Sequence, residues 1–385
     1  TPIYKFSQNI PNYLLTWEKS YNTNIGIDAA FLNNRIDVSM EYYNTKTKDV
    51  IWNKALPVIN GAFSPDGGPK ANYTTNLNMC ETSNKGFELA LNTRNIITKN
   101  FTWSSSVTFN HNKEKITKLS GGDSDVLNNG DTGYALALGE AINSYYHYKL
   151  DGVWQKGEET DAAVFGAAPG DLKINIPNLV KESDGRFYKI DEETGSAAVD
   201  ENGNVIYYTS DNKYTPSDAD YQILGHNSPD WSLGFQNNFT WKDFDLSVFV
   251  YARYGQMFAY DMLTSYDPKG IRNFPTYFNY WTENNPSNDF PAANANKGLE
   301  QYTGYYALRY VDGSFIKIKN ITLGYSLPKS ILKSAGIEKC RFYATITNPF
   351  VFAKSHLLKD YDPEMNGSLK YPLTKQFVFG VNVTF

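Results

Sequence analysis

Apolar residues recur at every second position along much of the chain, and the spacing of amphipathic helices is nearly absent. From Ile36 onward, for example, apolar side chains alternate with the acidic Asp37 and Glu41. Successive side chains of a strand point to opposite faces, so this pattern predicts strands with one apolar and one polar face. We predict nine such strands, over residues 16–31, 35–50, 84–94, 101–116, 230–241, 244–256, 314–327, 339–349 and 372–385.

A soluble sandwich and a membrane barrel would both show this alternation. The predicted strands favour the barrel, because several exceed the ~5–6 residues of an ordinary soluble strand. Aromatic residues that suit interfacial girdles also stand near predicted strand ends: Trp17, Trp103, Phe109, Trp241, Phe244 and Phe385. The connections alternate between short turns and long loops, and the long loops are residues 51–83, 118–229, 257–312 and 350–371.

Short turns on one rim and long loops on the other are typical of outer-membrane barrels. If the short turns face the periplasm, the predicted strands alternate in direction from both ends of the chain, and residues 118–229 form one large outer excursion. The Tyr-rich stretch 144–148 then lies in this loop or has a partner strand that the pattern does not reveal. Within 314–327 the alternation slips phase, which predicts a β-bulge near Lys319 and Asn320.

About nine strands cannot close a single-chain bacterial barrel, whose strand number is even, and lipid does not tolerate an open edge. We therefore expect the missing strands to come from an N-terminal part that precedes this chain. The chain opens at Thr1 without an initiator Met or a leader segment, which fits the same expectation of a fragment.

Composition narrows the function classes. The sequence contains no run of ~20 apolar residues, which excludes a helical membrane protein. A net charge of -5 argues against a nucleic-acid partner. With 2 Cys and 4 dispersed His, we expect no disulfide framework, no metal site and no cofactor. Common catalytic motifs are also missing, so we expect no enzyme.

The two cysteines fall far apart in this topology. We place Cys80 in the outer loop 51–83 and Cys340 near the periplasmic start of its strand. A hydrocarbon layer of ~25 Å would separate them, which is beyond the reach of a disulfide. The prediction is two free thiols.

Several segments are distinctive: residues 15–20 (LTWEKS), 24–28 (NIGID), 31–35 (FLNNR), 42–49 (YYNTKTKD), 84–89 (NKGFEL), 169–173 (PGDLK), 224–225 (LG), 315–328 (FIKIKNITLGYSLP) and 378–385 (VFGVNVTF). In this order they resemble the C-terminal half of SusC-like TonB-dependent transporters, and the resemblance covers nearly the whole chain. It implies that residues 1–385 are the C-terminal part of an all-β, antiparallel transmembrane barrel of ~22 strands, with the N-terminal plug and first strands absent.

The resemblance also implies a function and a location. Family members import oligosaccharides, or in some cases peptides, across the outer membrane of Gram-negative, Bacteroidota-type bacteria. A SusD-like surface lipoprotein acts as a lid, TonB pulls on the plug, and two transporter copies often pair. The family often carries a Ca²⁺-type acidic loop after the PGDLK segment, but here residues 183–191 break the carboxylate spacing, so we expect no calcium there.

Two sets of residues are candidates for the transport path. Aromatic loop residues could stack on a sugar or contact a peptide, although loop packing or contact with the lid is an equally good interpretation: Tyr145, Tyr146, Trp154, Tyr266, Tyr280 and Trp281. Polar strand residues could line a substrate path, although a hydrated wall that contacts the plug would use the same residues: Asp37, Glu41, Tyr43, Glu88, Arg341 and Tyr343.

Two other functions stay open at this point. A soluble, secreted carbohydrate-binding module of β-sheets would share the alternation, and would be recovered from the aqueous phase without detergent. A porin or adhesin barrel without TonB coupling would share the membrane topology as well. Only the N-terminal plug and TonB box would separate it from an importer.

Overall fold

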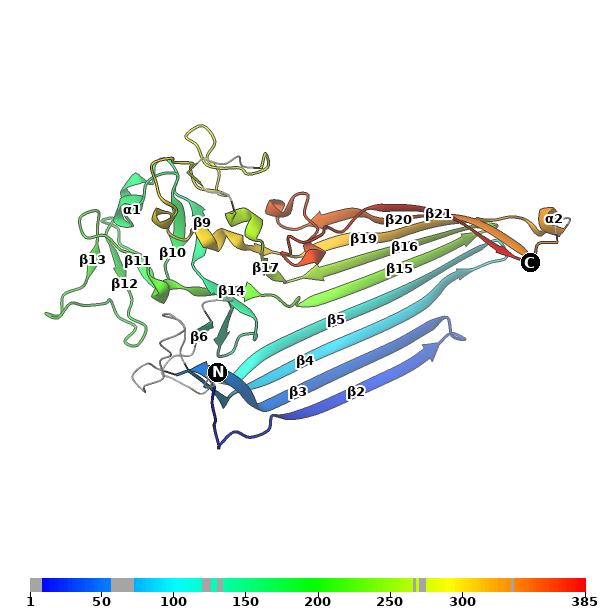
Figure 1. The fold of residues 1–385 in the computed structure, drawn as a ribbon, viewed down its shortest axis with the longest axis horizontal. Coiled ribbons are helices and arrows are strands. Elements are labelled where there is room, and N and C mark those ends of the chain that lie inside the picture. Colours follow the sequence, from blue (N-terminus) through cyan, green and yellow to red (C-terminus); the bar gives the residue numbers. More distant parts are fainter. Residues whose placement is uncertain are drawn as a thin grey trace, which may run out of the picture.

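The structure is a computed structural model that describes residues 9–56, 73–119, 126–129, 134–265, 268–269, 275–333 and 336–385. Nine long strands form one antiparallel sheet in which every strand pairs with its neighbours in chain order (Figure 1). Their bounds are β2 Lys19–Phe31, β3 Ile36–Ala55, β4 Thr74–Ile97, β5 Phe101–Leu119, β15 Trp231–Trp241, β16 Phe244–Tyr254, β19 Phe315–Ser326, β20 Lys339–Ala353 and β21 Gln376–Thr384. A short strand, β1 (Asn9–Ile10), pairs in parallel with β4. The nine predicted strands are thus confirmed, in the predicted order.

The register of the sheet separates its two faces. One row of directly paired residues crosses eight strands and is apolar throughout: Ala29, Val38, Leu91, Val107, Phe235, Val250, Ile318 and Phe350. The next row lies on the other face and is mostly polar: Ala30, Asp37, Asn92, Ser106, Gln236, Phe249, Asn320, Thr347 and Gln376. We call these the apolar face and the polar face.

No second sheet covers the apolar face within the described residues, since all nine long strands belong to one sheet. The side chain of Phe379 is 81% exposed, and Ile25, Leu323 and Val381 are also exposed. A soluble sandwich would bury these residues against a facing sheet. The arrangement instead matches a wall whose apolar side meets lipid.

The predicted bulge is confirmed. The pairing of β19 with β16 and with β20 shifts by one residue at Lys319. This extra residue keeps Ile316 and Ile318 on the same face as Ile321, although their spacing in sequence breaks the alternation. The phase slip in the sequence therefore preserves the apolar face rather than interrupting it.

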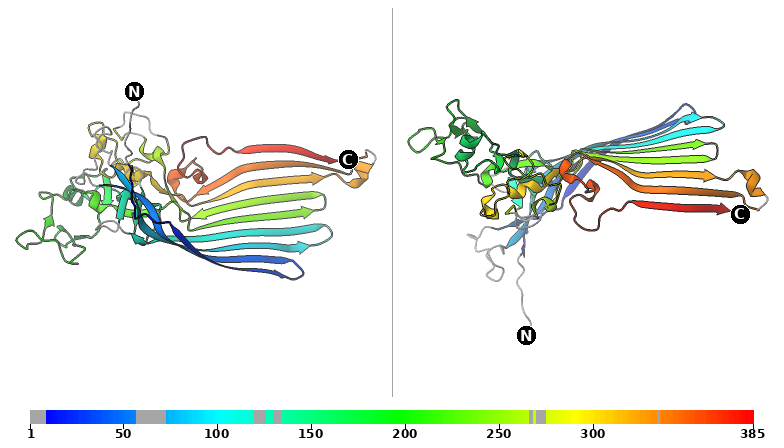
Figure 2. Two further views of the ribbon diagram at one scale, coloured as in Figure 1. Left: turned by 60° about the horizontal axis from the view of Figure 1, so that its bottom comes forward. Right: turned by 90° about the horizontal axis from the view of Figure 1, so that it is seen from above.

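Short turns and long connections collect at opposite ends of the sheet (Figure 1). The end with the short turns carries the residues after β2, β4, β15 and β19, and also helix α2 (Lys329–Leu332) and the C-terminus. Figure 2 shows the sheet from two further directions, with the remaining elements gathered beyond its other end. We call these ends the short-turn rim and the loop rim. Strands β2 and β21 form the edges of the open sheet.

The loop rim carries small sheets and one further α-helix, α1 (Glu159–Val164). The remaining strands are β6 Val126–Asn129, β7 Tyr134–Ala137, β8 Ser144–His147, β9 Lys149–Val153, β10 Leu172–Asn175, β11 Leu179–Lys181, β12 Phe187–Lys189, β13 Tyr207–Tyr208, β14 Gln222–His226, β17 Met257–Ala259 and β18 Tyr310–Asp312. The Tyr-rich stretch forms β8, and its partners β7 and β14 lie within the same excursion. Among the described residues, no helix is long and apolar enough to span a bilayer.

Strands β3 and β4 are longer than predicted, so the connection between them is residues 56–73 rather than 51–83. Cys80 therefore lies within β4, and its predicted position in a loop is wrong. The extension was missed because residues such as Asn76 and Asn78 are polar, whereas strand pairing depends on backbone hydrogen bonds. Cys80 and Cys340 are both free thiols.

Candidate functional site at the loop rim

The segments above the sheet share a hydrophobic core of their own. It combines residues from both long excursions and from the connection between β20 and β21, and includes Val153, Phe258, Leu263, Tyr305 and Leu358. These connections therefore form one packed layer over the loop rim.

An aromatic cluster lies within this layer around β8. The hydroxyls of Tyr134 and Tyr145 are 3.1 Å apart, and the ring of Tyr145 lies 4.9 Å from that of Tyr310. The His147 ring stacks on Tyr221 at 4.8 Å. Burial and the nearby Arg309 guanidinium lower the pKa of His147 to about 4, so this imidazole is neutral at physiological pH.

A cavity of about 430 Å³ adjoins the cluster. Its lining mixes aromatic, apolar and polar side chains, among them Tyr148, Gln222, Leu308, Tyr310 and Asp289. Such a mixture is typical of sites for small organic ligands. Burial raises the pKa of Tyr148 to about 12, so its hydroxyl is protonated and offers a hydrogen-bond donor.

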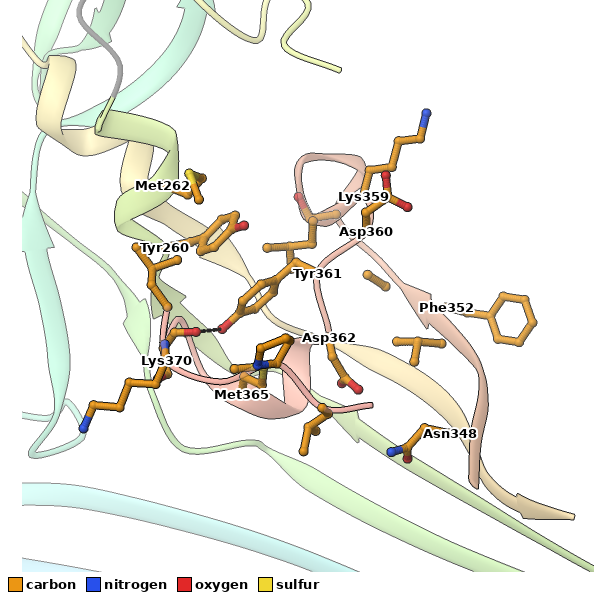
Figure 3. A pocket seen from close by; sticks show the side chains of 18 of the residues that line it. Tyr260, Met262, Asn348, Phe352, Lys359, Asp360, Tyr361, Asp362, Met365 and Lys370 are labelled. Carbon is orange, nitrogen blue, oxygen red and sulfur yellow. Dashed lines mark hydrogen bonds between the residues drawn. The ribbon is translucent and has the colours of Figure 1, made fainter. Parts of the chain in front are cut away.

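A larger crevice of about 860 Å³ lies between β20 and the segment that leads to β21 (Figure 3). In Figure 3 the ring of Tyr361 points toward the segment that carries Met365 and Lys370, whereas Phe352 points away. The Tyr361 hydroxyl donates to the carbonyl oxygen of Ser368 at 3.1 Å. Tyr361 therefore ties the two arms of this segment together.

Polar side chains bond to one another across the strands below the loop rim. Asn110 donates to Glu88 at 2.9 Å, Asn24 donates to Glu41, and the Tyr43 hydroxyl donates to Asn112 at 2.8 Å. Close to the short-turn rim, Arg341 forms a bidentate pair with Asp245, at 2.8 Å from Nε and 2.5 Å from Nη2. This pair spans Gly324 of the intervening strand, where a Cβ atom would lie 2.4 Å from both partners.

The family profile described as TonB dependent receptor-like, beta-barrel, matches residues 2–155. This part of the chain matches the β-barrel of TonB-dependent receptors. Two curated relatives are each 28% identical: "TonB-dependent receptor P3" of Formosa agariphila over 96% of this chain, and "TonB-dependent receptor SusC" of Bacteroides thetaiotaomicron over 97%. This chain covers 34% and 32% of their lengths, so it spans about a third of the relatives that it matches.

A solved structure confirms the fold of the receptor barrel. The structure entitled "Structure of the RagAB peptide transporter" superimposes with a TM-score of 0.68 at 24% identity, over 96% of this chain and 36% of that chain. The resemblance to SusC-like receptors is thus confirmed, and the sheet is a portion of an outer-membrane β-barrel. In outer-membrane barrels the apolar face of the wall meets lipid and the polar face lines the lumen. That the polar face of this sheet lines a lumen stays a prediction.

The predicted lumen-lining residues all lie on strands of the receptor wall. Asp37, Glu41 and Tyr43 are on β3, Glu88 is on β4, and Arg341 and Tyr343 are on β20. Their cross-strand partners Asn92, Gly86, Asn110, Gly324 and Gly380 place all six on the polar face. Whether they contact a substrate or a plug stays a prediction.

The predicted substrate-binding aromatics fall into two groups. Tyr145, Trp154 and Trp281 are buried, with 4%, 5% and 8% exposure. Trp154 stacks on Phe165 under Lys173, and the Trp281 indole donates to Gln155 at 2.9 Å. These three side chains pack the loop layer, and substrate contact by them stays a prediction.

The other aromatics are more accessible. Tyr146 is half-buried beside Tyr221, and Tyr280 is 41% exposed. Tyr266 lies outside the described residues. Of the six, Tyr146 and Tyr280 are therefore the better candidates for contact with a bound molecule.

Sequence reasoning missed several charged residues on the polar face. Asp245 was not recognised as the partner of Arg341, although its place in the alternation of β16 could have indicated its face. Lys317 was also missed, although it alternates regularly with Ile316 and Ile318 on β19. Its carboxylate partners, Asp362 and Glu364, are 45 and 47 residues away in a connection without periodicity.

Metal binding finds no geometric support in the described part of the chain, where no three His, Cys, Asp or Glu side chains form a group that could hold an ion. In the segment with the broken calcium pattern, Asp184 instead pairs with Arg186 at 2.7 Å. Asp191 accepts a hydrogen bond from the backbone of Thr194 at 2.8 Å. Both carboxylates thus have partners within the protein.

Proposed function

We propose that this chain is the C-terminal wall of an outer-membrane importer that takes up oligosaccharide or oligopeptide nutrients. Import would draw energy from TonB through an N-terminal plug outside this chain, and a SusD-like lipoprotein would close the loop rim. A second transporter copy is a further proposed partner. The relatives named SusC and RagAB support this proposal by their family and fold.

The two-faced register carries the proposal. The sheet has an apolar row across eight strands and, beside it, a mostly polar row across nine. A wall between lipid and a wet lumen requires such a pair of rows. A soluble carbohydrate-binding module would need a second layer over the apolar face, and none is present within the described residues. The loop layer further supports capture of a solute, because its 430 Å³ cavity combines tyrosine rings with polar groups.

The substrate class has two candidates. The RagAB structure is named as that of a peptide transporter, which favours a peptide, whereas the name SusC states no substrate. Aromatic rings such as Tyr146 and Tyr280 would serve either class, since they bind the apolar faces of sugars and peptide side chains alike. We therefore propose both classes and leave the choice to experiment.

The test uses the full-length receptor in its native outer membrane. Mass spectrometry of the detergent-purified protein should find copurifying oligosaccharides or oligopeptides. Cells that lack the receptor should lose growth on that class of nutrient, and so should cells whose TonB is inactive. Uptake that persists without TonB would instead identify a porin. Release of the protein into the aqueous phase without detergent would refute a membrane barrel.

A further inference from the structure

The connection between β20 and β21 folds back against the polar face of the sheet. We call its central part, residues 356–368, the inner loop. It includes the single-turn 3-10 helices η8 (His356–Leu358) and η9 (Pro363–Met365). The inner loop contacts Arg253 of β16, Ala259 of β17 and Lys317 of β19, so it lies over the polar face of the sheet.

A buried lysine anchors the inner loop. Lys317 of β19 has a side chain that is 0% exposed, and its Nζ lies 2.5 Å from Asp362 and 2.8 Å from Glu364. Glu364 also pairs with Lys319 at 2.6 Å. Because a buried charge is costly without its partners, Lys317 strongly favours the conformation in which both carboxylates are docked.

Asp362 also shapes the loop that it anchors. Its Oδ1 accepts a hydrogen bond from the backbone N–H of Glu364 at 3.1 Å and caps η9, while Oδ2 faces Lys317. Pro363 follows at the first position of this turn and is fully buried. The sequence Asp-Pro-Glu thus presents two carboxylates to one lysine from a rigid turn.

A second anchor holds the far arm of the inner loop. Gln256 donates to Asn366 at 2.6 Å, and Arg253 of β16 reaches the same oxygen at 3.4 Å. Gly367 has a φ of +81° and approaches the carbonyl of Ala259 so closely that a Cβ atom would lie 2.0 Å from it. Only glycine fits this approach, so the backbone itself is packed against the wall.

A third anchor is apolar. Leu358 is buried in the core of the loop layer, and the ring of Tyr361 lies 4.3 Å from that of Tyr260. Polar, backbone and apolar contacts therefore all fix the same conformation.

From these contacts we infer that the inner loop is a fixed constriction of the lumen that sets the largest solute the importer passes. Lys317 is the positioning residue for this constriction. The inference rests on the proposed import function, because it treats the polar face as the wall of a transport path. The lysine partners of the inner loop, Lys317 and Lys319, lie two and four residues below the loop-rim end of β19, roughly 7 to 13 Å along the wall at ~3.3 Å per residue.

The first test removes the anchor without leaving an unpaired charge. The double variant Lys317→Met/Asp362→Asn keeps the shape of both side chains and leaves Lys319 with Glu364. Lys339→Met, at the short-turn rim, is the matched control. In the full-length receptor we expect the double variant to import normal nutrients but also to admit bulky antibiotics, seen as a several-fold drop in the inhibitory concentration. The control should behave like the wild type.

A second test does not depend on the folding of that variant. Lys319→Cys/Glu364→Cys, joined by a short bis-methanethiosulfonate reagent, holds the inner loop against β19. A fixed constriction predicts unchanged nutrient uptake after this cross-link. Loss of uptake on cross-linking would show a moving gate and overturn the inference. A correctly folded double variant with unchanged antibiotic resistance would overturn it as well. Failure of the proposed function would instead show as no uptake by the wild type.

Discussion

Replacement of Phe235 by arginine should destabilise the barrel, whereas the same replacement at the next residue should not. Phe235 is the fifth of eleven residues in β15, near mid-strand, and lies between Val107 and Val250 in the apolar row. An arginine on the lipid face near the bilayer midplane costs about 2–4 kcal/mol. Gln236 lies in the polar row beside Ser106, where an arginine would stay hydrated, so we expect its cost to stay within about 0.5 kcal/mol.

The assay is urea unfolding of the full-length receptor in lipid vesicles, followed by the heat-dependent shift of the folded band on gels. Phe235→Met is the control, because it removes the ring but keeps an apolar side chain. We expect Phe235→Met to cost clearly less than Phe235→Arg. If Gln236→Arg were as damaging as Phe235→Arg, the assignment of the two faces would be refuted.

Two further predictions concern particular contacts. Gly324→Val should displace the bidentate pair of Asp245 and Arg341, which lies across this glycine. We expect a loss of stability of up to about 1.5–3 kcal/mol in the same unfolding assay, since hydrogen bonds to charged groups have this strength. An unchanged unfolding midpoint would contradict this expectation. In the loop layer, burial opposes ionisation of Asp220, but hydrogen bonds from Lys189 and other donors hold its pKa below the ordinary 3.8. The stability that the Asp220 carboxylate contributes is fully present above the pKa of this group in the unfolded state. It is lost as the pH falls through the lower pKa of the folded state. Hydrogen exchange in residues 176–221, corrected for its intrinsic pH dependence, should therefore become faster below about pH 4. The Asp220→Asn variant should show this faster exchange already at neutral pH. Equal protection in the wild type and the variant at both pH values would refute this prediction.

The wall could be predicted from the sequence because each strand carries its own signal. Every second residue of a strand points to the lipid side. The alternation around Val38 or Phe235 therefore indicates directly which side chains face lipid. Even the irregularity at Lys319 was informative, since a phase slip in a strand that must keep one apolar face requires a bulge.

Strand lengths beyond the membrane were harder to predict. Residues such as Asn76 and Asn78 continue the hydrogen-bond ladder of β4 beyond the predicted strand. The neighbouring residues Met79 and Cys80 are both buried there, although they point to opposite faces, so burial no longer separates one apolar face from one polar face. The true length of these strands, and with it the position of Cys80, depends on backbone pairing and on packing against Ile116 and Leu136.

The loop layer and the inner loop could not be predicted at all. The anchors of the inner loop join Lys317 to Asp362 and Glu364, and Gln256 to Asn366, across long separations in sequence. Aromatic residues such as Trp154 and Trp281 stand out by composition, but only three-dimensional packing distinguishes a buried ring from an accessible one. The arrangement of these loops therefore depends on packing that the sequence pattern does not reveal.

The most direct test of the two-faced wall is a spin-label scan along β16 in the full-length receptor, reconstituted in lipid. Labels at residues 245–250 would be compared for their collision rates with oxygen, which concentrates in lipid, and with a water-soluble nickel complex. We predict strict alternation: oxygen collisions dominate at Leu246, Val248 and Val250, and nickel collisions dominate at the positions between them. Equal nickel access on both faces, or protection of both from oxygen, would contradict a wall between lipid and lumen.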